Sequence, residues 1–249
     1  MISEKIFASE FSGFWAEALP FLTPRAIAEL NLNATTMSDG RREWMKPLAG
    51  SGDNSNNDII AETAFGLFAA AHTEGKAIVE LLRAEPTHIQ RIVEGAKMRV
   101  GALRREGYSR PRRVQLNTNE AIDLAIRLEA YFREYESDSI IIQPRFKGCG
   151  ILDSCYGDIL AGKTLCEVKM VDRNLRSADI RQVLTYGALN YRSSQYAIDN
   201  VTILNPRRGL EFSFNVEDLT KRVSGTTASE FFHRVTTFLA DFEAVHQPS

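Results

Sequence analysis

The chain contains few of the residues that form disulfide scaffolds or histidine-rich metal sites. It has three cysteines and four histidines in 249 residues, and one cysteine would stay unpaired in any set of disulfides. Cys149, Cys155 and Cys166 do not have the paired spacing of a zinc site. These absences exclude a disulfide-stabilised secreted domain and predict a reduced, cytoplasmic protein.

Excess charge and long apolar segments are missing as well. The formal net charge is −2 at pH 7, so any attraction to nucleic acid has to come from local basic patches. The N-terminus does not resemble a signal peptide, and no apolar run is long enough to span a bilayer, so no membrane partner is expected. With 44% hydrophobic and 25% charged residues, the composition predicts a globular protein with an ample core.

Residues 157–169, GDILAGKTLCEVK, have the pattern of a β-hairpin. Gly162-Lys163 suits a two-residue type II′ turn, which takes glycine at its first central position. Folding about this turn pairs Ile159 with Cys166 and fixes the register of both strands. The face that carries these two apolar side chains is expected to point toward the core.

The other face of this hairpin collects charged side chains. Asp158 lies opposite Glu167, with Cβ atoms about 5 Å apart, and Lys169 follows two residues later on the same face. Two carboxylates this close repel each other unless a divalent cation lies between them, so the pattern predicts a metal-dependent hydrolase site. An exposed cross-strand charge cluster is the alternative, and Asp153 competes with Asp158 for the first metal position.

The same segment also matches a phosphate-binding motif. Gly157 to Thr164 fits G-x-x-x-x-G-K-[ST], the P-loop of nucleotide-binding proteins. That motif requires a helix after the loop, whose N-terminal amides hold the phosphates. The residues after Thr164 alternate like a strand instead, so a P-loop nucleotide-binding protein is kept as an alternative that only a helix at this position would support.

A helix is expected after the hairpin and a polar connector. Ser177 is a suitable N-cap, and Asp179 lies in the first turn, where its charge favours the helix dipole. The helix should run to about Asn190. Gln182 and Tyr186 are four residues apart, so they lie on one face of it, and taken alone they indicate a surface hydrogen-bonding pair.

Together these residues resemble the PD-(D/E)XK nuclease superfamily. The Gly157-Asp158 pair, the Glu167-Val168-Lys169 strand and the helix with Gln182 and Tyr186 are similar to its RecB- and McrC-like branch, over roughly residues 117–210. The resemblance implies an α/β fold with a restriction-endonuclease-like mixed central sheet flanked by helices. It also implies Mg²⁺- or Mn²⁺-dependent hydrolysis of DNA phosphodiester bonds, in phage defence, restriction or DNA repair.

The resemblance assigns a role to each position. The implied catalytic residues are Asp158, Glu167, Lys169, Gln182 and Tyr186. Asp158 and Glu167 would be metal ligands together with the main-chain carbonyl of Val168, because hard divalent cations take oxygen ligands. Lys169 would position or activate the attacking water. Gln182 and Tyr186 would contact the DNA backbone or brace the site.

Members of the superfamily often supply one more acidic ligand from the helix before the core sheet. That helix should begin near Asn117, and Glu120 is the first candidate for the ligand. With Asn117 as N-cap, Glu120 would equally be the N3 partner of a capping box. Glu129 is the other candidate, because it shares a helical face with apolar residues. The histidine that the RecB branch often carries upstream is absent, since none lies between His88 and His233.

Local basic residues provide the candidate DNA contacts. The segment from Arg91 to Arg113 is rich in arginine and could follow a phosphate backbone, although a solvated helix face explains such a run as well. The expected DNA-binding residues are Arg104, Arg105, Arg110, Arg112, Arg113, Arg173 and Arg176. DNA is the expected partner, and a homodimer or a partner protein of a multi-component system is compatible with the sequence.

The expected domain boundary follows this basic segment. Residues 1–112 are expected to form a helical N-terminal region, and residues 113–249 a PD-(D/E)XK nuclease-like domain. Two strands, about 197–204 and 210–214, and a final helix, about 228–245, should complete the second domain. A DNA-binding or complex-forming protein that keeps the nuclease scaffold without catalysis is the second functional hypothesis.

Overall fold

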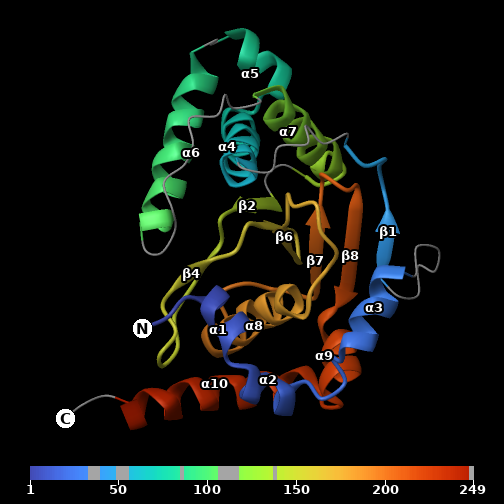
Figure 1. Ribbon diagram of the computed structural model, residues 1–249, viewed down its shortest axis with the longest axis vertical. Coiled ribbons are helices and arrows are strands. Elements are labelled where there is room, and N and C mark those ends of the chain that lie inside the picture. The colour runs from blue at the N-terminus through green and yellow to red at the C-terminus, as the bar shows by residue number, and fades with distance from the viewer. Residues whose placement is uncertain (33–39, 49–55, 85–86, 106–117, 137–138, 247–249) are drawn as a thin grey trace.

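The computed structural model describes residues 1–32, 40–48, 56–84, 87–105, 118–136 and 139–246. These residues form a mixed α/β fold, in which helices cover both faces of a six-stranded sheet (Figure 1). The predicted class, a mixed sheet flanked by helices, is confirmed at this level. No helix in the described ranges is long and apolar enough to cross a membrane.

The sheet has the strand order β1-β8-β7-β6-β5-β2. Its strands are β1 (Arg41–Glu43), β2 (Ile140–Ile142), β5 (Ile159–Ala161), β6 (Thr164–Val168), β7 (Asn200–Asn205) and β8 (Leu210–Asn215). Only β6 and β7 are parallel neighbours among these strands. A parallel pair needs a crossover connection, which contains helix α8 (Ser177–Ser193). A separate two-stranded ribbon consists of β3 (Arg145–Phe146) and β4 (Cys155–Tyr156).

The predicted hairpin is present with the predicted register. Strands β5 and β6 pair Ile159 with Cys166 and Ala161 with Thr164. Gly162 has a φ of +57° at the first central position of the turn, as a type II′ turn requires. Strand β6 follows the turn directly, where a P-loop needs a helix. This segment therefore does not form a P-loop.

Helices on the two faces of the sheet enclose two apolar cores. The face of Leu160 and Leu165 packs with α8. The same core includes residues of α1 (Glu4–Glu10), α2 (Ser12–Ala18), α3 (Pro24–Leu32), α9 (Val216–Ser224) and α10 (Ala228–His246). The face of Ile159 and Cys166 packs with α4 (Asn57–Glu74), α5 (Ile78–Ala84) and α7 (Thr118–Phe132), and α6 (His88–Arg105) packs on α4.

Because both faces are covered, the charged side chains of the hairpin lie inside the protein. Leu165 and Cys166 point to opposite faces, yet both are fully buried. Glu167, on the face of Leu165, is only 4% exposed. The alternative of an exposed cross-strand charge cluster is therefore wrong.

Some elements differ from the sequence-based expectation. The described part of residues 1–112 also contains a strand, since β1 pairs with β8 at one edge of the sheet, and the predicted boundary near residue 112 lies outside the described residues. Helix α9 is not predicted from the sequence. The N-cap of α8 is Arg176 instead of Ser177, because the carboxylate of Asp179 accepts the Arg176 N–H at 2.9 Å. The two late strands and the final helix are confirmed.

Candidate active site

Asp158 and Glu167 come from the two strands of the hairpin. Asp158 directly precedes β5, and Glu167 is the fourth residue of β6. One carboxylate oxygen of Asp158, Oδ2, accepts a hydrogen bond from the main-chain N–H of Val168 at 2.7 Å. This bond fixes the carboxylate beside the end of β6. The structure thus brings together the two acids that the hairpin register pairs.

The carboxylate of Glu167 raises the cost of ionising Asp158. Burial and, after it, the negative charge of Glu167 raise the pKa of Asp158 to about 8, while Val168 N–H, Lys169 and Lys5 act in the opposite direction. The second carboxylate oxygen of Glu167, Oε2, is buried and accepts no hydrogen bond from the described residues. Buried acceptors without a donor are rare. A divalent cation would satisfy this oxygen and relieve the repulsion.

Lys169 lies against the same glutamate. Its Nζ donates to Glu167 Oε1 at 2.8 Å and to Gln182 Oε1 at 2.7 Å, and its side chain is 16% exposed. Burial acts to lower the pKa of Lys169, but the charge and the hydrogen bond of Glu167 outweigh it, so that the pKa is raised. The amine therefore stays protonated inside the site.

Helix α8 brings the predicted Gln182–Tyr186 pair into this network. Both side chains are buried, and Gln182 Nε2 donates to the Tyr186 hydroxyl at 3.0 Å. The hydroxyl also lies 3.2 Å from the main-chain carbonyl oxygen of Tyr156. Burial, more than the nearby carboxylates, raises the pKa of Tyr186, so the hydroxyl stays neutral. The pair therefore lies inside the protein and is not a surface pair.

A third acid, Glu4 on α1, completes the network and is not predicted from the sequence. Glu4 is 8% exposed, and its Oε1 lies 3.3 Å from Gln182 Nε2 and 3.4 Å from the Tyr186 hydroxyl. A carboxylate only accepts hydrogen bonds. Glu4 therefore holds the NH₂ of Gln182 toward itself and the amide oxygen toward Lys169. The sequence shows only Ser3 as an N-cap, with Glu4 in the first turn, and this pattern does not indicate burial.

The two predicted DNA contacts near α8 have different environments. Arg173 forms a bidentate ion pair with Asp179 at 2.7 and 2.8 Å. Burial acts to raise the pKa of Asp179, but Arg173 and the Arg176 N–H outweigh it and lower the pKa. The guanidinium group of Arg173 is thus engaged at the start of α8, whereas Arg176 is exposed.

The other acidic candidates do not join the carboxylate pair. Glu120 lies on α7 and forms a buried ion pair with Arg207, whose Nε donates to the main chain of Met170. Glu129 accepts the N–H of Ile78 at 2.9 Å and so holds the start of α5. Asp153 lies in the loop before β4, and its N–H is bonded to the carbonyl of Ile2.

The predicted basic segment lies only partly within the described residues, since residues 106–113 fall outside them. Arg104 and Arg105 are the last two residues of α6. Arg110, Arg112 and Arg113 lie outside the described residues, as does Asn117, the expected N-cap of α7. The structure therefore leaves the role of this segment in DNA binding as a prediction.

No family model, curated protein or solved structure matches this chain. Among the described residues, no group of three or more His, Cys, Asp and Glu side chains is placed to hold a metal ion. A cation at Asp158 and Glu167 would therefore need further oxygen ligands from the main chain, from water or from a phosphate. The chemistry of the site has to be inferred from its own geometry.

Proposed function

We propose that the protein is a nuclease that hydrolyses DNA phosphodiester bonds with Mg²⁺ or Mn²⁺. The observation that carries this proposal is the pair of half-buried Asp158 and buried Glu167. One oxygen of Glu167 accepts no hydrogen bond from the described residues, and the ammonium group of Lys169 lies 2.8 Å from its other oxygen. Two buried like charges are costly without a cation. The same three residues carry the resemblance to the PD-(D/E)XK nucleases.

The residues present fit a hard divalent cation. Asp158 and Glu167 would hold it through carboxylate oxygens, with the main-chain carbonyl of Val168 as a further donor, and Mg²⁺ and Mn²⁺ prefer such ligands. When bound, the cation makes a water molecule more acidic and offsets the negative charge of the phosphate. Glu167 Oε2, which accepts no hydrogen bond from the described residues, would gain a partner.

Lys169 supplies a positive charge from the protein. Its ammonium group donates to Glu167 and Gln182, which leaves one of its three protons for the attacking water or for a phosphate oxygen. Because Glu4 fixes the Gln182 amide, this orientation exists before substrate binds. Because the ammonium group of Lys169 is already held in place, it does not have to reorient when negative charge develops on the phosphate.

DNA is proposed as the substrate on the resemblance to RecB- and McrC-like nucleases. A cleavage panel tests it: linear, circular, nicked and single-stranded DNA, with RNA alongside, are incubated with Mg²⁺, with Mn²⁺ or with EDTA. Wild-type protein should cut DNA only when metal is present. Asp158→Asn, Glu167→Gln and Lys169→Met should each slow cleavage by about 100-fold or more.

Asp153→Asn is the matched control, because Asp153 is the neighbouring acid that lies outside the carboxylate pair. It should cut at the wild-type rate. Cleavage that persists in Asp158→Asn and Lys169→Met would contradict the proposal. DNA binding without cleavage under every condition would instead support a scaffold that has lost catalysis.

A further inference from the structure

The ladder of β2 and β5 continues past Asp158 and extends beyond the sheet as a two-stranded ribbon. Strands β2 and β5 pair in the sheet, and β3 and β4 pair in the ribbon. Between these pairs, the Gln143 N–H donates to the Asp158 carbonyl at 2.8 Å, and the Gly157 N–H donates to the Pro144 carbonyl at 3.0 Å. The ladder therefore keeps one register from sheet to ribbon, and Asp158 lies at the junction.

The ladder bends at this junction. Gln143, which lies opposite Asp158, has a φ of +53°. This left-handed conformation is uncommon for a residue with a side chain, and such residues gather at functional sites. Figure 1 shows β4 extending away from the sheet toward the N-terminus. The ribbon thus projects past the carboxylate pair.

The inner face of the ribbon is anchored to α8 and to the loop after it. The ring of Phe146 stacks on the ring of Tyr186, with centroids 5.2 Å apart. The Tyr186 hydroxyl lies 3.2 Å from the Tyr156 carbonyl, and the Tyr196 hydroxyl accepts the Arg145 N–H at 3.1 Å. These contacts hold the ribbon in a set position relative to the residues around Lys169.

The outer face of the ribbon is aromatic and basic. Arg145, Lys147 and Tyr156 are exposed, and Tyr156 is 57% exposed. Arg145 and Tyr156 are cross-strand partners, so their side chains share this face. Tyr156 also stands only two residues before Asp158. An exposed ring beside cations is the combination by which proteins bind single-stranded nucleic acid.

We propose that the outer face of this ribbon binds a single strand of DNA that flanks the scissile bond. Tyr156 stacks on an unpaired base, and Arg145 and Lys147 contact phosphates. The inference rests on the proposed nuclease function and adds its substrate class. A base within a duplex would have to leave its stack before it could meet the ring. The ribbon therefore favours single strands, flaps and frayed ends.

Substitution of Tyr156 tests the stacking contact. The dissociation constant of a fluorescein-labelled single-stranded oligonucleotide is measured by anisotropy in EDTA, and KM is measured with Mg²⁺. Tyr156→Ala should weaken binding about 5- to 100-fold, the expected effect of losing one stacked base, and should raise KM similarly. Tyr156→Phe keeps the ring and should bind like the wild type.

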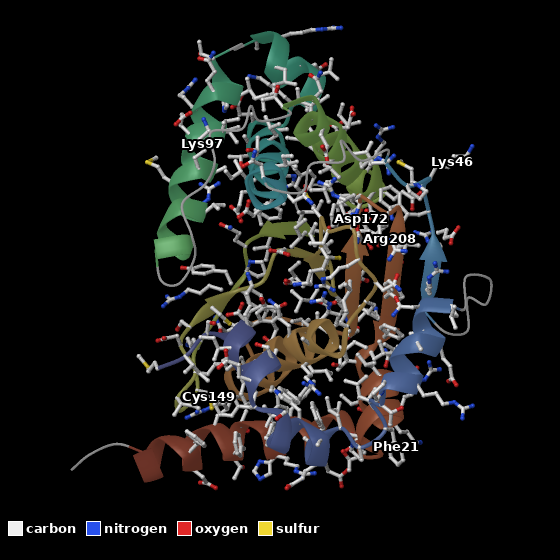
Figure 2. All side chains as sticks on the ribbon, viewed as in Figure 1. Phe21, Lys46, Lys97, Cys149, Asp172 and Arg208 are labelled. Carbon is white, nitrogen blue, oxygen red and sulfur yellow. The ribbon has the colours of Figure 1, made fainter. Side chains whose placement is uncertain are left out.

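Phe21→Ala is the matched control for an exposed ring. Phe21 is 58% exposed, and in Figure 2 it lies across the molecule from Cys149, which belongs to the loop of the ribbon. Its replacement should leave the dissociation constant unchanged. An equal loss of affinity in this variant would show that the effect of Tyr156→Ala is not specific to the ribbon and would overturn the assignment.

Salt dependence tests the phosphate contacts. In a variant that carries both Arg145→Ala and Lys147→Ala, the slope of log K against log salt concentration should become shallower by about 0.7 for each lost contact. Lys221→Ala removes an exposed lysine on α9 and should leave the slope unchanged. An unchanged slope in the double variant would overturn the assignment of Arg145 and Lys147 to phosphates.

The nuclease proposal and the ribbon assignment fail in different ways. If the wild-type protein cuts DNA and Tyr156→Ala binds and cuts a single strand equally well, the ribbon assignment is overturned and the nuclease stands. Equal wild-type affinity for duplex and single strand would also overturn it. If the wild-type protein cuts no nucleic acid with either metal, the nuclease function fails, and the substrate class fails with it.

Discussion

Replacing Asp158 with asparagine should stabilise the metal-free protein, although the residue belongs to the proposed active site. The pKa of Asp158 is raised from 3.8 to about 8, first by burial and then by Glu167. The folded protein therefore holds this proton more tightly than the unfolded chain does. The resulting stabilisation is complete below about pH 4 and is lost as the pH rises toward 8.

The size of the effect follows from the pKa. One pKa unit corresponds to about 1.4 kcal/mol, so ionisation of Asp158 costs the folded state at most about 4 kcal/mol at pH 7. Asp158 keeps some solvent exposure, and screening leaves an expected difference of about 1–3 kcal/mol. Asparagine carries no charge, and its side-chain oxygen can still accept the Val168 N–H.

Urea denaturation in EDTA between pH 5 and 9 measures this difference. The excess stability of Asp158→Asn over the wild type should grow as the pH rises from about 5 to 8, whereas Asp153→Asn should follow the wild type. Added Mg²⁺ should stabilise the wild type more than Asp158→Asn, because ligands that bind only the folded state stabilise it. A variant less stable than the wild type at pH 8 without metal would refute the reasoning.

Three further variants probe the surroundings of the site. The glutamine side chain in Glu4→Gln can donate a hydrogen bond as well as accept one, so it no longer fixes the orientation of the Gln182 amide. In steady-state assays kcat should fall about 10- to 100-fold, and KM should stay nearly unchanged. Glu120→Ala leaves the guanidinium of Arg207 buried without its carboxylate and should cost about 3–5 kcal/mol of unfolding free energy, measured in urea. The Cβ that Gly162→Ala adds meets no neighbouring atom, but the alanine has to keep a φ of +57°. This left-handed conformation should lower the unfolding free energy by about 1 kcal/mol, also measured in urea.

Each of these three predictions has a control variant or a result that would contradict it. Glu10→Gln changes an exposed acid at the end of the same helix and should leave kcat unchanged; a wild-type kcat in Glu4→Gln would refute the positioning role. Adding Arg207→Met to Glu120→Ala should restore part of the lost stability, and no recovery would contradict the ion-pair explanation. A Gly162→Ala protein as stable as the wild type would contradict the turn assignment.

The elements that could be predicted are those whose causes lie within a few residues. Gly162-Lys163 specifies the turn through its backbone preference, and alternation then sets the register that pairs Ile159 with Cys166. Helix α9 could have been found in the same way. Asn215 accepts the N–H groups of two first-turn residues, and Gly225 ends the helix with a φ of +79°.

Other features depend on partners that are distant in the sequence. Strand β1 has the sequence Arg-Arg-Glu, which has no apolar alternation, and it is a strand because it pairs with the edge of β8. Glu120 has the spacing of a capping residue or a ligand, but its position against Arg207 is set by the packing of α7 on the sheet. No local pattern indicates either outcome.

The short-range pattern of the chain determined the hairpin and the shared face of Asp158, Glu167 and Lys169, because turn chemistry and strand alternation act between neighbours. Packing of the whole chain decided that this face is enclosed and that Glu4 reaches Gln182 from 178 positions away. Burial is a property of what covers a side chain. It arises only when α1 and α8 come together over the sheet, and it gives Asp158 its high cost of ionisation and its affinity for a proton.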